Sequence, residues 1–415
     1  MIQRSIRTGF RVINNFAAVR QKSAFSFPTK LNVVDPLEYE QVEPDKDDEI
    51  VIAMSSGVDS SVTASLYAKS YKNVRGVYMA NWSQSAKCLE DDWNDVKRVC
   101  GQLKIPCERV NFEREYWTDV FEPMINMYKN GLTPNPDVGC NKYVKFGKMI
   151  EHLHNKFENV DKKWWLVTGH YARIMRHRES GKYHLLRGLY PNKDQSYYLS
   201  MLPPDTLSRV LMPIGHMTKP DVREIAAKEN LITASKPDSQ GLCFVSQDNK
   251  KFGSFLDEYI RPNPGNYVTE DGKIWGTHNG LWHATIGQRA NICMPQGDPK
   301  YKGVWFVSEK RTDTNELVIV KGGNNAALYA SKLRVRDWQW LETNFDTSKF
   351  CTDNLTIQYR SLQNSPDAVA SFESLGNDEV EIHLKESARA MAPGQNIVLY
   401  NGNRVLGCGV LQITN

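Results

Sequence analysis

Seven consecutive residues between an apolar run and a helical pattern carry the strongest chemical signal in the sequence. They are Ser55–Ser61, which read Ser-Ser-Gly-Val-Asp-Ser-Ser and follow the apolar run Ile50–Met54. Small residues let a phosphate approach the backbone, and free N–H groups at a helix start favour negative charge. The serine hydroxyls add further donors. The pattern therefore predicts a strand–loop–helix unit that binds a chain of phosphates.

Two common nucleotide motifs do not fit this loop. No Gly-Lys pair in the sequence is followed by Ser or Thr, so there is no Walker A loop, and no Gly-x-Gly-x-x-Gly follows a strand. The run instead resembles the PP-loop of ATP pyrophosphatases, which adenylate a substrate and release pyrophosphate. Glycine is usual in that family where this chain has Ser56, so a positive φ there would strain the serine. A serine-rich turn that only caps a helix is the alternative interpretation.

A second cluster occupies Asn135–Lys142, which reads Asn-Pro-Asp-Val-Gly-Cys-Asn-Lys. A cysteine near a helix start with lysines around it is expected to have its thiolate favoured, which applies to Cys140. Three lysines recur at every third residue, and we expect them on roughly one helix face: Lys142, Lys145 and Lys148. The alternative is a loop cysteine beside a solvated lysine stripe.

A third cluster, Asp238–Phe244, places Cys243 in another polar, glycine-containing loop. The two loop cysteines are 103 residues apart, and sequence alone does not pair them. The eight cysteines of the chain include no Cys-x-x-Cys pair. We therefore expect no structural zinc.

Together the three clusters closely resemble the MnmA/TrmU family of tRNA 2-thiouridylases. The resemblance runs from about Ile50 to the C-terminus and includes further motifs at Thr168–Arg173, Asp194–Tyr197, Thr285–Arg289 and Ala392–Gln395. It implies an enzyme that uses ATP with Mg²⁺ to 2-thiolate the wobble uridine of tRNA. It also implies an upstream protein that donates persulfide sulfur.

The resemblance further implies roles for individual residues. ATP is expected to contact Ala53, Met54, Ser55, Ser56, Gly57, Val58, Asp59, Ser60, Met79 and Gly169. The flipped target uridine is expected at Asn135, Pro136 and Asp137. Other tRNA contacts are expected at His170, Lys193, Asp194, Gln195, Tyr359, Arg360 and Gln395. Cys243 would carry the persulfide, Cys140 would be the second catalytic thiol, and Asp137 a general acid or base.

The chemistry explains why both a nucleotide and two thiols are needed. The oxygen on uracil C2 is a poor leaving group, and adenylation converts it into AMP, which leaves readily. A persulfide then delivers sulfur to C2, either directly or after Cys140 releases it as hydrosulfide. Attack of Cys140 on the Cys243 persulfide would leave a Cys140–Cys243 disulfide that needs reduction.

The elements that position these groups follow an α/β pattern up to about residue 243. Candidate strands at Ile50–Met54, Val74–Met79, Cys107–Phe112 and Trp165–Thr168 alternate with helical segments such as Asp91–Leu103 and Tyr116–Lys129. This alternation predicts a Rossmann-like parallel sheet covered by helices, with ligands at the carboxyl ends of its strands. We expect a catalytic domain over 49–243, a small mixed connector over 244–315 and an antiparallel β-barrel over 316–415.

The N-terminus has a different composition from the rest. Residues 1–34 contain six Lys or Arg and no Asp or Glu, which is typical of a mitochondrial presequence and predicts the matrix; a disordered basic arm is the alternative. An acidic linker is expected over 35–48. Without the presequence, the 52 basic residues fall to 46 against 48 acidic ones, a net charge of −2. Any tRNA site must then be a local patch, and Lys142, Lys145 and Lys148 with Arg173, Arg176 and Arg178 are candidates.

Three other interpretations remain open at this point. The nearest is a PP-loop amidating ligase, which needs ammonia, and nothing in the sequence resembles a glutaminase. A non-catalytic tRNA-binding protein is the second. The third is a metal or iron–sulfur cluster held by Asp137, Cys140 and Cys243. No run of the sequence is long and apolar enough to predict a membrane span.

Overall fold

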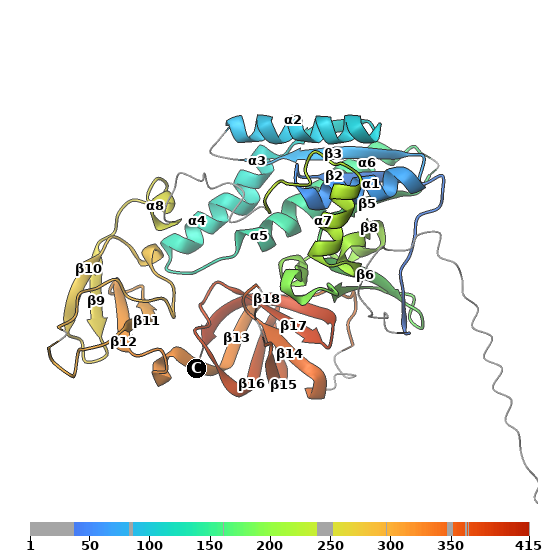
Figure 1. Cartoon of the computed structure of the whole chain (residues 1–415). Helices are drawn as coiled ribbons and strands as arrows, with labels where there is room; N and C mark the ends of the chain where they lie inside the picture. The colour runs from blue at the N-terminus through green and yellow to red at the C-terminus, as the bar shows by residue number, and fades with distance from the viewer. Residues whose placement is uncertain are drawn as a thin grey trace, which may run out of the picture.

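The computed structural model describes residues 37–82, 86–160, 162–238, 252–295, 297–346, 352–361, 363 and 365–414. The expected presequence and Cys243 lie outside these residues. Figure 1 shows a helix-covered sheet, a small second sheet and a closed barrel formed by the C-terminal strands. The predicted fold class is thereby confirmed. Within the described residues, no helix is both long and apolar enough to cross a membrane.

The first sheet contains five parallel strands in the order β4-β3-β2-β5-β8. They are β2 (Glu49–Met54), β3 (Val74–Ala80), β4 (Cys107–Asn111), β5 (Trp164–Thr168) and β8 (Val210–Leu211). The first four match the predicted strands to within one residue at each end. A parallel sheet is normally covered on both faces, which explains why its central strands read as apolar runs.

Alternate side chains of β2 pack into two different cores. Ile50 and Ile52 join the cluster formed with α1 (Val58–Ser70) and α2 (Ala86–Leu103). Val51 points to the opposite face, where it joins a larger cluster that includes side chains of the segment 113–157. This division follows from the two-residue period of a strand.

Two interrupted helices supply that second face. The first consists of α3 (Glu113–Tyr116), the π-helical η1 (Trp117–Phe121) and α4 (Glu122–Lys129). The second consists of α5 (Pro136–Gly139), the π-helical η2 (Cys140–Lys148) and α6 (Met149–Phe157). A π segment widens the helical turn through i→i+5 hydrogen bonds, and such segments are frequent at functional sites.

The remaining helices are short. They are α7 (Lys219–Lys228), α8 (Phe252–Leu256), η3 (Pro191–Lys193), η4 (Ser196–Leu199), η5 (Pro204–Arg209), η6 (Pro213–His216), η7 (Leu281–His283), η8 (Ala326–Leu328) and η10 (Thr352–Asn354). Of these, α7 bears most directly on the site because it packs against α1. A capping box between Thr218 and Asp221 fixes its first residue.

The second sheet has the strand order β10-β9-β12-β11. Its strands are β9 (Gly265–Thr269), β10 (Ile274–His278), β11 (Trp305–Arg311) and β12 (Glu316–Lys321). The barrel expected over 316–415 includes the apolar run of β12. The structure corrects this, because β12 pairs in parallel with β9 and buries Leu317 and Ile319 in the core of the second sheet.

Six later strands close into the predicted barrel. They are β13 (Tyr329–Trp340), β14 (Leu355–Gln358), β15 (Asp367–Gly376), β16 (Glu379–Arg389), β17 (Asn396–Asn401) and β18 (Arg404–Thr414). They pair in the order β18-β13-β16-β15-β14-β17, and the pairing of β17 with β18 closes the ring. Every pairing is antiparallel.

A hairpin of the catalytic part extends the barrel sheet. It consists of β6 (Ala172–His177) and β7 (Tyr183–Arg187), and Leu186 of β7 pairs with Arg404 of β18. The short strand β1 (Tyr39–Glu40) pairs with β6 on its other edge. Residues 35–48 were expected to be only an acidic linker. The described part of this segment is instead packed, since Tyr39 is buried against His184 and Trp165 donates a 2.7 Å bond to Asp48.

The barrel also contacts the chain just before α5. The Thr133 N–H donates to the Pro393 carbonyl (2.8 Å), and Gln395 Nε2 donates to the Thr133 carbonyl (2.8 Å). Gly394 between them has φ +95°, and a Cβ there would lie 2.7 Å from the Thr133 nitrogen. Only glycine fits this turn without displacing the backbone that leads into Asn135.

We predict that Gly394→Ala destabilises the protein by roughly 1–3 kcal/mol more than Gly376→Ala, because it adds a backbone clash to the cost of the positive φ. Gly376 is the matched control, since its φ is +81° and a Cβ added there would have no atom within 4 Å. Urea unfolding of both variants measures the difference. Equal midpoints would contradict the inferred contact.

Candidate active site

The loop after β2 has the geometry of an anion site. Gly57 is the N-cap of α1 with φ −84° and ψ 165°, and no side chain caps the helix start. The N–H groups of a first helical turn have no acceptor within the helix. Ser60 Oγ accepts from the Ser55 N–H (3.2 Å) and donates to the Gly57 carbonyl (3.1 Å), which holds the loop together.

Ser56 adopts φ +57°, which confirms that this position requires a positive φ. Its hydroxyl donates to Asp92 Oδ1 at 2.5 Å and accepts from Lys236 Nζ at 3.0 Å. A glycine at this position would have neither bond. These contacts, which tie the loop to α2 and to Lys236, offset part of the backbone strain.

Gly169 lies directly against the start of α1. A Cβ on this residue would come within 2.8 Å of the Ser60 nitrogen and 2.9 Å of the Asp59 carbonyl carbon. Thr168, the last residue of β5, pairs with Ala53 of β2, so both strands end side by side. Met79 sits near the end of the neighbouring β3. The structure therefore gathers the expected nucleotide residues from Ala53 to Ser60, Met79 and Gly169 along one edge of the sheet.

A network of ion pairs begins at Asp59, the second residue of α1. Lys219 Nζ lies 2.7 and 2.9 Å from its two carboxylate oxygens, and Tyr171 Oη donates to Oδ1 at 2.8 Å. Lys219 also pairs with Asp238 at 2.9 Å. Asp238 in turn pairs with Lys193 (2.8 Å) and Arg223 (2.5 Å). One carboxylate is thus surrounded by three cations.

This surrounding determines the protonation of Asp238. Partial burial raises the pKa of its carboxyl, but hydrogen bonds and charges from Lys193, Lys219 and Arg223 outweigh burial and hold that pKa well below its usual range. Burial likewise raises the pKa of the Tyr171 hydroxyl, and the neighbouring Asp59 charge raises it further. At neutral pH the carboxylate is therefore charged and the phenol neutral.

The second predicted cluster forms a capped helix start. The Asn135 side chain accepts from the Asp137 N–H at 3.2 Å, and Pro136 occupies the first helical position. Burial raises the pKa of the Asp137 carboxyl, while the nearby Lys145 ammonium lowers it in part. Cys140 begins the π segment one turn later.

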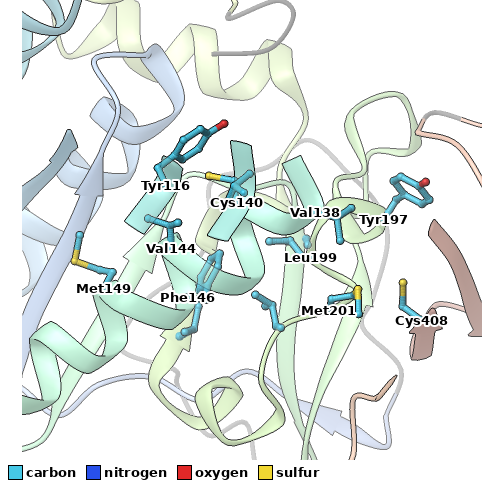
Figure 2. Packing of buried hydrophobic residues seen from close by; sticks show 14 of the residues in the cluster. Tyr116, Val138, Cys140, Val144, Phe146, Met149, Tyr197, Leu199, Met201 and Cys408 are labelled. Carbon is cyan, nitrogen blue, oxygen red and sulfur yellow. The ribbon is translucent and has the colours of Figure 1, made fainter. Parts of the chain in front are cut away.

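Cys140 is buried at 3% exposure among hydrophobic side chains that include Tyr116, Val138 and Val144. Figure 2 shows this cluster, with the Cys140 sulfur among the labelled side chains. Asn81 Nδ2, just after β3, lies 3.9 Å from Cys140 Sγ. Cys140 therefore lies at the same carboxyl edge of the sheet as the Ser55–Ser60 loop.

The third cluster is described only in part. The described chain stops at Asp238 and resumes at Phe252, so Cys243 lies outside it and its reaction with Cys140 stays a prediction. Among the residues that the structure describes, no group of three or more His, Cys, Asp or Glu could hold a metal ion.

His170 follows Gly169 and lies between the two clusters. Its Nδ1 is 2.8 Å from Thr168 Oγ1, and its ring is 5.8 Å from that of Phe146 on η2. Burial and the nearby Lys145 charge lower the pKa of His170 to about 3. The imidazole is therefore neutral at physiological pH and offers a hydrogen bond rather than a charge.

Three expected tRNA residues come together in one pocket of about 370 Å³. Tyr359, Arg360 and Gln395 line it from the barrel, and the motif Thr285–Gln288 lines it from the neighbouring segment. The Arg360 guanidinium lies 4.8 Å from the Tyr359 ring centroid and donates to the Arg389 carbonyl at 2.8 Å. Because Gln395 also bonds to Thr133, this pocket adjoins the chain that leads to Asn135.

Three other expected tRNA residues already have partners within the protein. Lys193 pairs with Asp238, and Gln195 Oε1 accepts from the Tyr171 N–H at 2.9 Å. Asp194 is buried, and its carboxylate accepts from Ser196, Arg187 and the Gly188 N–H. Asp194 therefore shapes the turn before η4.

The basic patch expected from six Lys and Arg residues does not form as one surface. Arg173 is 1% exposed and donates to the Arg187 carbonyl, while Arg176 and Arg178 both pair with Glu40. The lysine stripe is also divided. The charge of Lys145 acts on Asp137 and His170, and Lys148 pairs with Glu151. The π-helical turn of η2 explains this, since residues three apart do not align along its face.

Sequence reasoning missed three cations beside the loop. Lys219, Arg223 and Lys236 belong to no motif identified above, and the segments that carry them lie more than 150 residues beyond Ser56. The Thr218 capping box does predict where α7 begins. It says nothing about the packing of α7 on α1.

Three family models match consecutive parts of the chain. They are described as a tRNA methyl transferase HUP domain (residues 48–247), a tRNA methyl transferase PRC-barrel domain (253–321) and an aminomethyltransferase beta-barrel domain (330–411). Their succession follows the order of the three sheets.

Curated relatives match over nearly their full length. The chain is 49% identical over 392 residues to "Mitochondrial tRNA-specific 2-thiouridylase 1" of Saccharomyces cerevisiae, which covers 90% of this chain and 93% of that protein. It is 39% identical over 371 residues to "tRNA-specific 2-thiouridylase MnmA" of Oceanobacillus iheyensis, covering 88% and 95%. It is 38% identical to the protein of that name from Bacillus subtilis, with the same coverage.

Solved structures show weaker likeness. The U34-tRNA thiolase NcsA from Methanococcus maripaludis, solved with its [4Fe-4S] cluster, has a TM-score of 0.30 and 16% identity, covering 52% of this chain and 66% of that one. NMN synthetase from Francisella tularensis also has a TM-score of 0.30, with 13% identity, covering 46% and 66%. Scores this low do not indicate a shared overall structure.

We predict that Asp238→Asn lowers the unfolding free energy by about 1 kcal/mol between pH 5 and 8, because three cations lose their shared carboxylate. The folded-state pKa of Asp238 lies below its unfolded value, so its contribution is complete above the unfolded pKa of about 3.9 and fades only as pH falls through the folded value. Urea unfolding at several pH values tests this. The exposed loop residue Asp313 supplies the control Asp313→Asn. A difference that disappears by pH 5 would exclude the inferred ionisation.

Proposed function

Because this chain belongs to the family of tRNA-specific 2-thiouridylases, we propose that it replaces the C2 oxygen of the wobble uridine in mitochondrial tRNA with sulfur. The proposal places the enzyme in the mitochondrial matrix, to which residues 1–34 would direct it. The observation that carries it is structural. The Ser55–Ser60 loop, His170 and the helix start with Asp137 and Cys140 all lie at the carboxyl edge of the first sheet.

ATP would bind with its phosphates at the Ser55–Ser60 loop and the start of α1, where N–H groups and hydroxyls converge. Met79 and Gly169 would border the nucleotide, and the close approach of Gly169 to Asp59 leaves no room for a larger side chain there. The Asp59 carboxylate and serine hydroxyls are hard oxygen ligands, so the donor set fits Mg²⁺. When bound, Mg²⁺ would neutralise phosphate charge.

The target uridine would unstack and lie against Asn135, Pro136 and Asp137. An unpaired anticodon base costs little to flip, since no base pair is broken. The pocket of Tyr359, Arg360 and Gln395 would hold adjacent tRNA through stacking and charge-assisted contacts. The barrel turn at Gln395 bonds to Thr133, which supports the view that one surface serves both contacts.

The reaction has two displacements. In the first, the uracil O2 attacks the α-phosphorus of ATP, and the electron pair of the broken bond leaves with pyrophosphate. In the second, the terminal sulfur of the Cys243 persulfide attacks C2, and AMP departs with the original oxygen. The Cys140 thiolate then attacks the inner sulfur, which breaks the S–S bond and frees the 2-thiouridine. In the other order, Cys140 attacks first and the released hydrosulfide attacks C2. Either order leaves a Cys140–Cys243 disulfide, which an external thiol reductant must reduce with two electrons.

Burial gives Asp137 a suitable role in proton transfer. Because its carboxyl pKa is raised, it exchanges a proton nearer to neutral pH than an exposed aspartate does. The upstream persulfide donor must reach Cys243, whose segment begins immediately after Asp238.

We predict that Cys140→Ser and Cys243→Ser each reduce thiolation at least 100-fold while ATP binding changes less than threefold, because the thiols act after adenylation. Mass spectrometry of nucleosides from tRNA treated with purified enzyme, ATP and a persulfide donor measures 2-thiouridine. Cys293→Ser, at an exposed cysteine, is the matched control. Full activity in either variant would remove that residue from the mechanism, and no 2-thiouridine with wild-type enzyme would reject the function.

We predict that Lys145→Met moves the acidic limb of the kcat/KM profile upward by roughly 0.5–1 pH unit. Removal of this positive charge disfavours the ionised Asp137 carboxylate and so raises its pKa further. Steady-state thiolation rates between pH 5 and 9 test this. Lys148→Met is the control, since Lys148 pairs with Glu151. A downward shift, or none, would contradict general base catalysis by Asp137.

A further inference from the structure

We infer that Lys219 is a phosphate-binding residue that stabilises the departing pyrophosphate, exchanging a carboxylate partner for phosphate oxygens when ATP binds. The inference rests on the proposed function and adds a residue that the sequence motifs do not contain. Three observations support it: the position of Lys219, the charges around it, and the exchange of a carboxylate for a phosphate that these charges permit.

The position of the Lys219 ammonium is closely defined. Its Nζ lies 2.7 and 2.9 Å from the two carboxylate oxygens of Asp59, which belongs to the first turn of α1. Its side chain is 12% exposed, and its Nζ lies 5.7 Å from the centroid of the Tyr171 ring. A charge that is shielded from solvent acts more strongly on a neighbouring anion.

The elements behind Lys219 hold it in place. It is the first residue of α7, whose start is fixed by the capping box of Thr218 and Asp221. Buried Val222 and Ala226 of α7 pack with Val58 and Val62 of α1 in one hydrophobic cluster. The lysine thus comes from a rigid element, and little reorganisation is needed when charge develops nearby.

The charges around Lys219 leave room for an anion. Among the residues that the structure describes, the carboxylates paired with Lys219, Lys193 and Arg223 are Asp59 and Asp238. These five side chains together carry an excess of one positive charge. Asp238 is shared among all three cations. When a phosphate binds, the Lys219 ammonium can therefore exchange its ion pair with Asp238 for one with the phosphate. Lys193 and Arg223 would still neutralise the Asp238 carboxylate.

This exchange fits the first displacement. When the bond between the α-phosphorus and the bridging oxygen breaks, its electron pair moves to the pyrophosphate. A cation at the β- and γ-phosphates stabilises that charge, and charge-assisted N–H bonds to phosphate are among the strongest available to a protein. AMP lacks these phosphates, so its binding does not depend on Lys219.

Binding measurements on the full-length protein test the inference. Calorimetric titrations of Lys219→Met with pyrophosphate, ATP and AMP, each with Mg²⁺, should show roughly 10- to 100-fold weaker binding of the first two and less than twofold change for AMP. Lys219→Arg should restore most of the affinity because it keeps the charge. Lys228→Met, at an exposed lysine of the same helix, is the matched control. Urea unfolding checks that each variant folds.

The outcomes separate this inference from the proposed function. Unchanged pyrophosphate binding in Lys219→Met, or equal loss of AMP and ATP binding, would overturn the phosphate role and leave a structural ion pair. Wild-type enzyme that binds pyrophosphate through Lys219 but makes no 2-thiouridine would reject the proposed function alone. Wild-type enzyme that binds neither ATP nor pyrophosphate would reject both.

Discussion

The parallel pairing of β2 with β3 and β5 determines where the chemistry of this protein can take place. In this register Ala53 lies beside Thr168, so the loop after β2 and the turn after β5 leave the sheet together. The two turns then pack so closely that Gly169 touches the backbone of α1. The Ser55–Ser60 loop, a neutral histidine and the helix start with Cys140 share one edge because of this alignment.

The barrel contributes to the same edge from the far end of the sequence. Its turn at Gly394 and Gln395 bonds to Thr133, two residues before the cap of α5. Support for Asn135 and Asp137 thus comes from a domain that also lines the neighbouring pocket. Under the proposed function, recognition of tRNA and positioning of its reacting base would be physically linked, since one turn would take part in both.

Local environment gives two aspartates opposite properties. Asp137 is buried with one lysine nearby, and its carboxyl pKa rises. Asp238 is also partly buried, but three cations surround it and its pKa falls. A raised pKa suits proton transfer, whereas the charged carboxylate of Asp238 holds three cations beside the loop proposed to bind ATP. The two carboxyl pKa values differ because the groups around each aspartate differ, although the residue type is the same.

The sequence by itself determined the features that depend on residues close to one another along the chain. The strand–loop–helix at Ser55–Ser61 and four strands of the first sheet follow from local composition. The positive φ at Ser56 was suggested only by the resemblance to a family with glycine at this position. Apolar period and turn residues also predicted the barrel, although the local pattern in β12 did not reveal that its partner is β9. The π segments were not predicted, because the apolar spacing resembles that of an α-helix.

Only the tertiary structure decided which distant groups meet. It paired Lys219 with Asp59 across 160 residues, buried Arg173 and engaged Arg176 with Glu40. Sequence patterns report the face of an element that is apolar, but they do not report which element covers that face. Long-range electrostatics depends on that packing, and so the cations of the site were visible only in the folded chain.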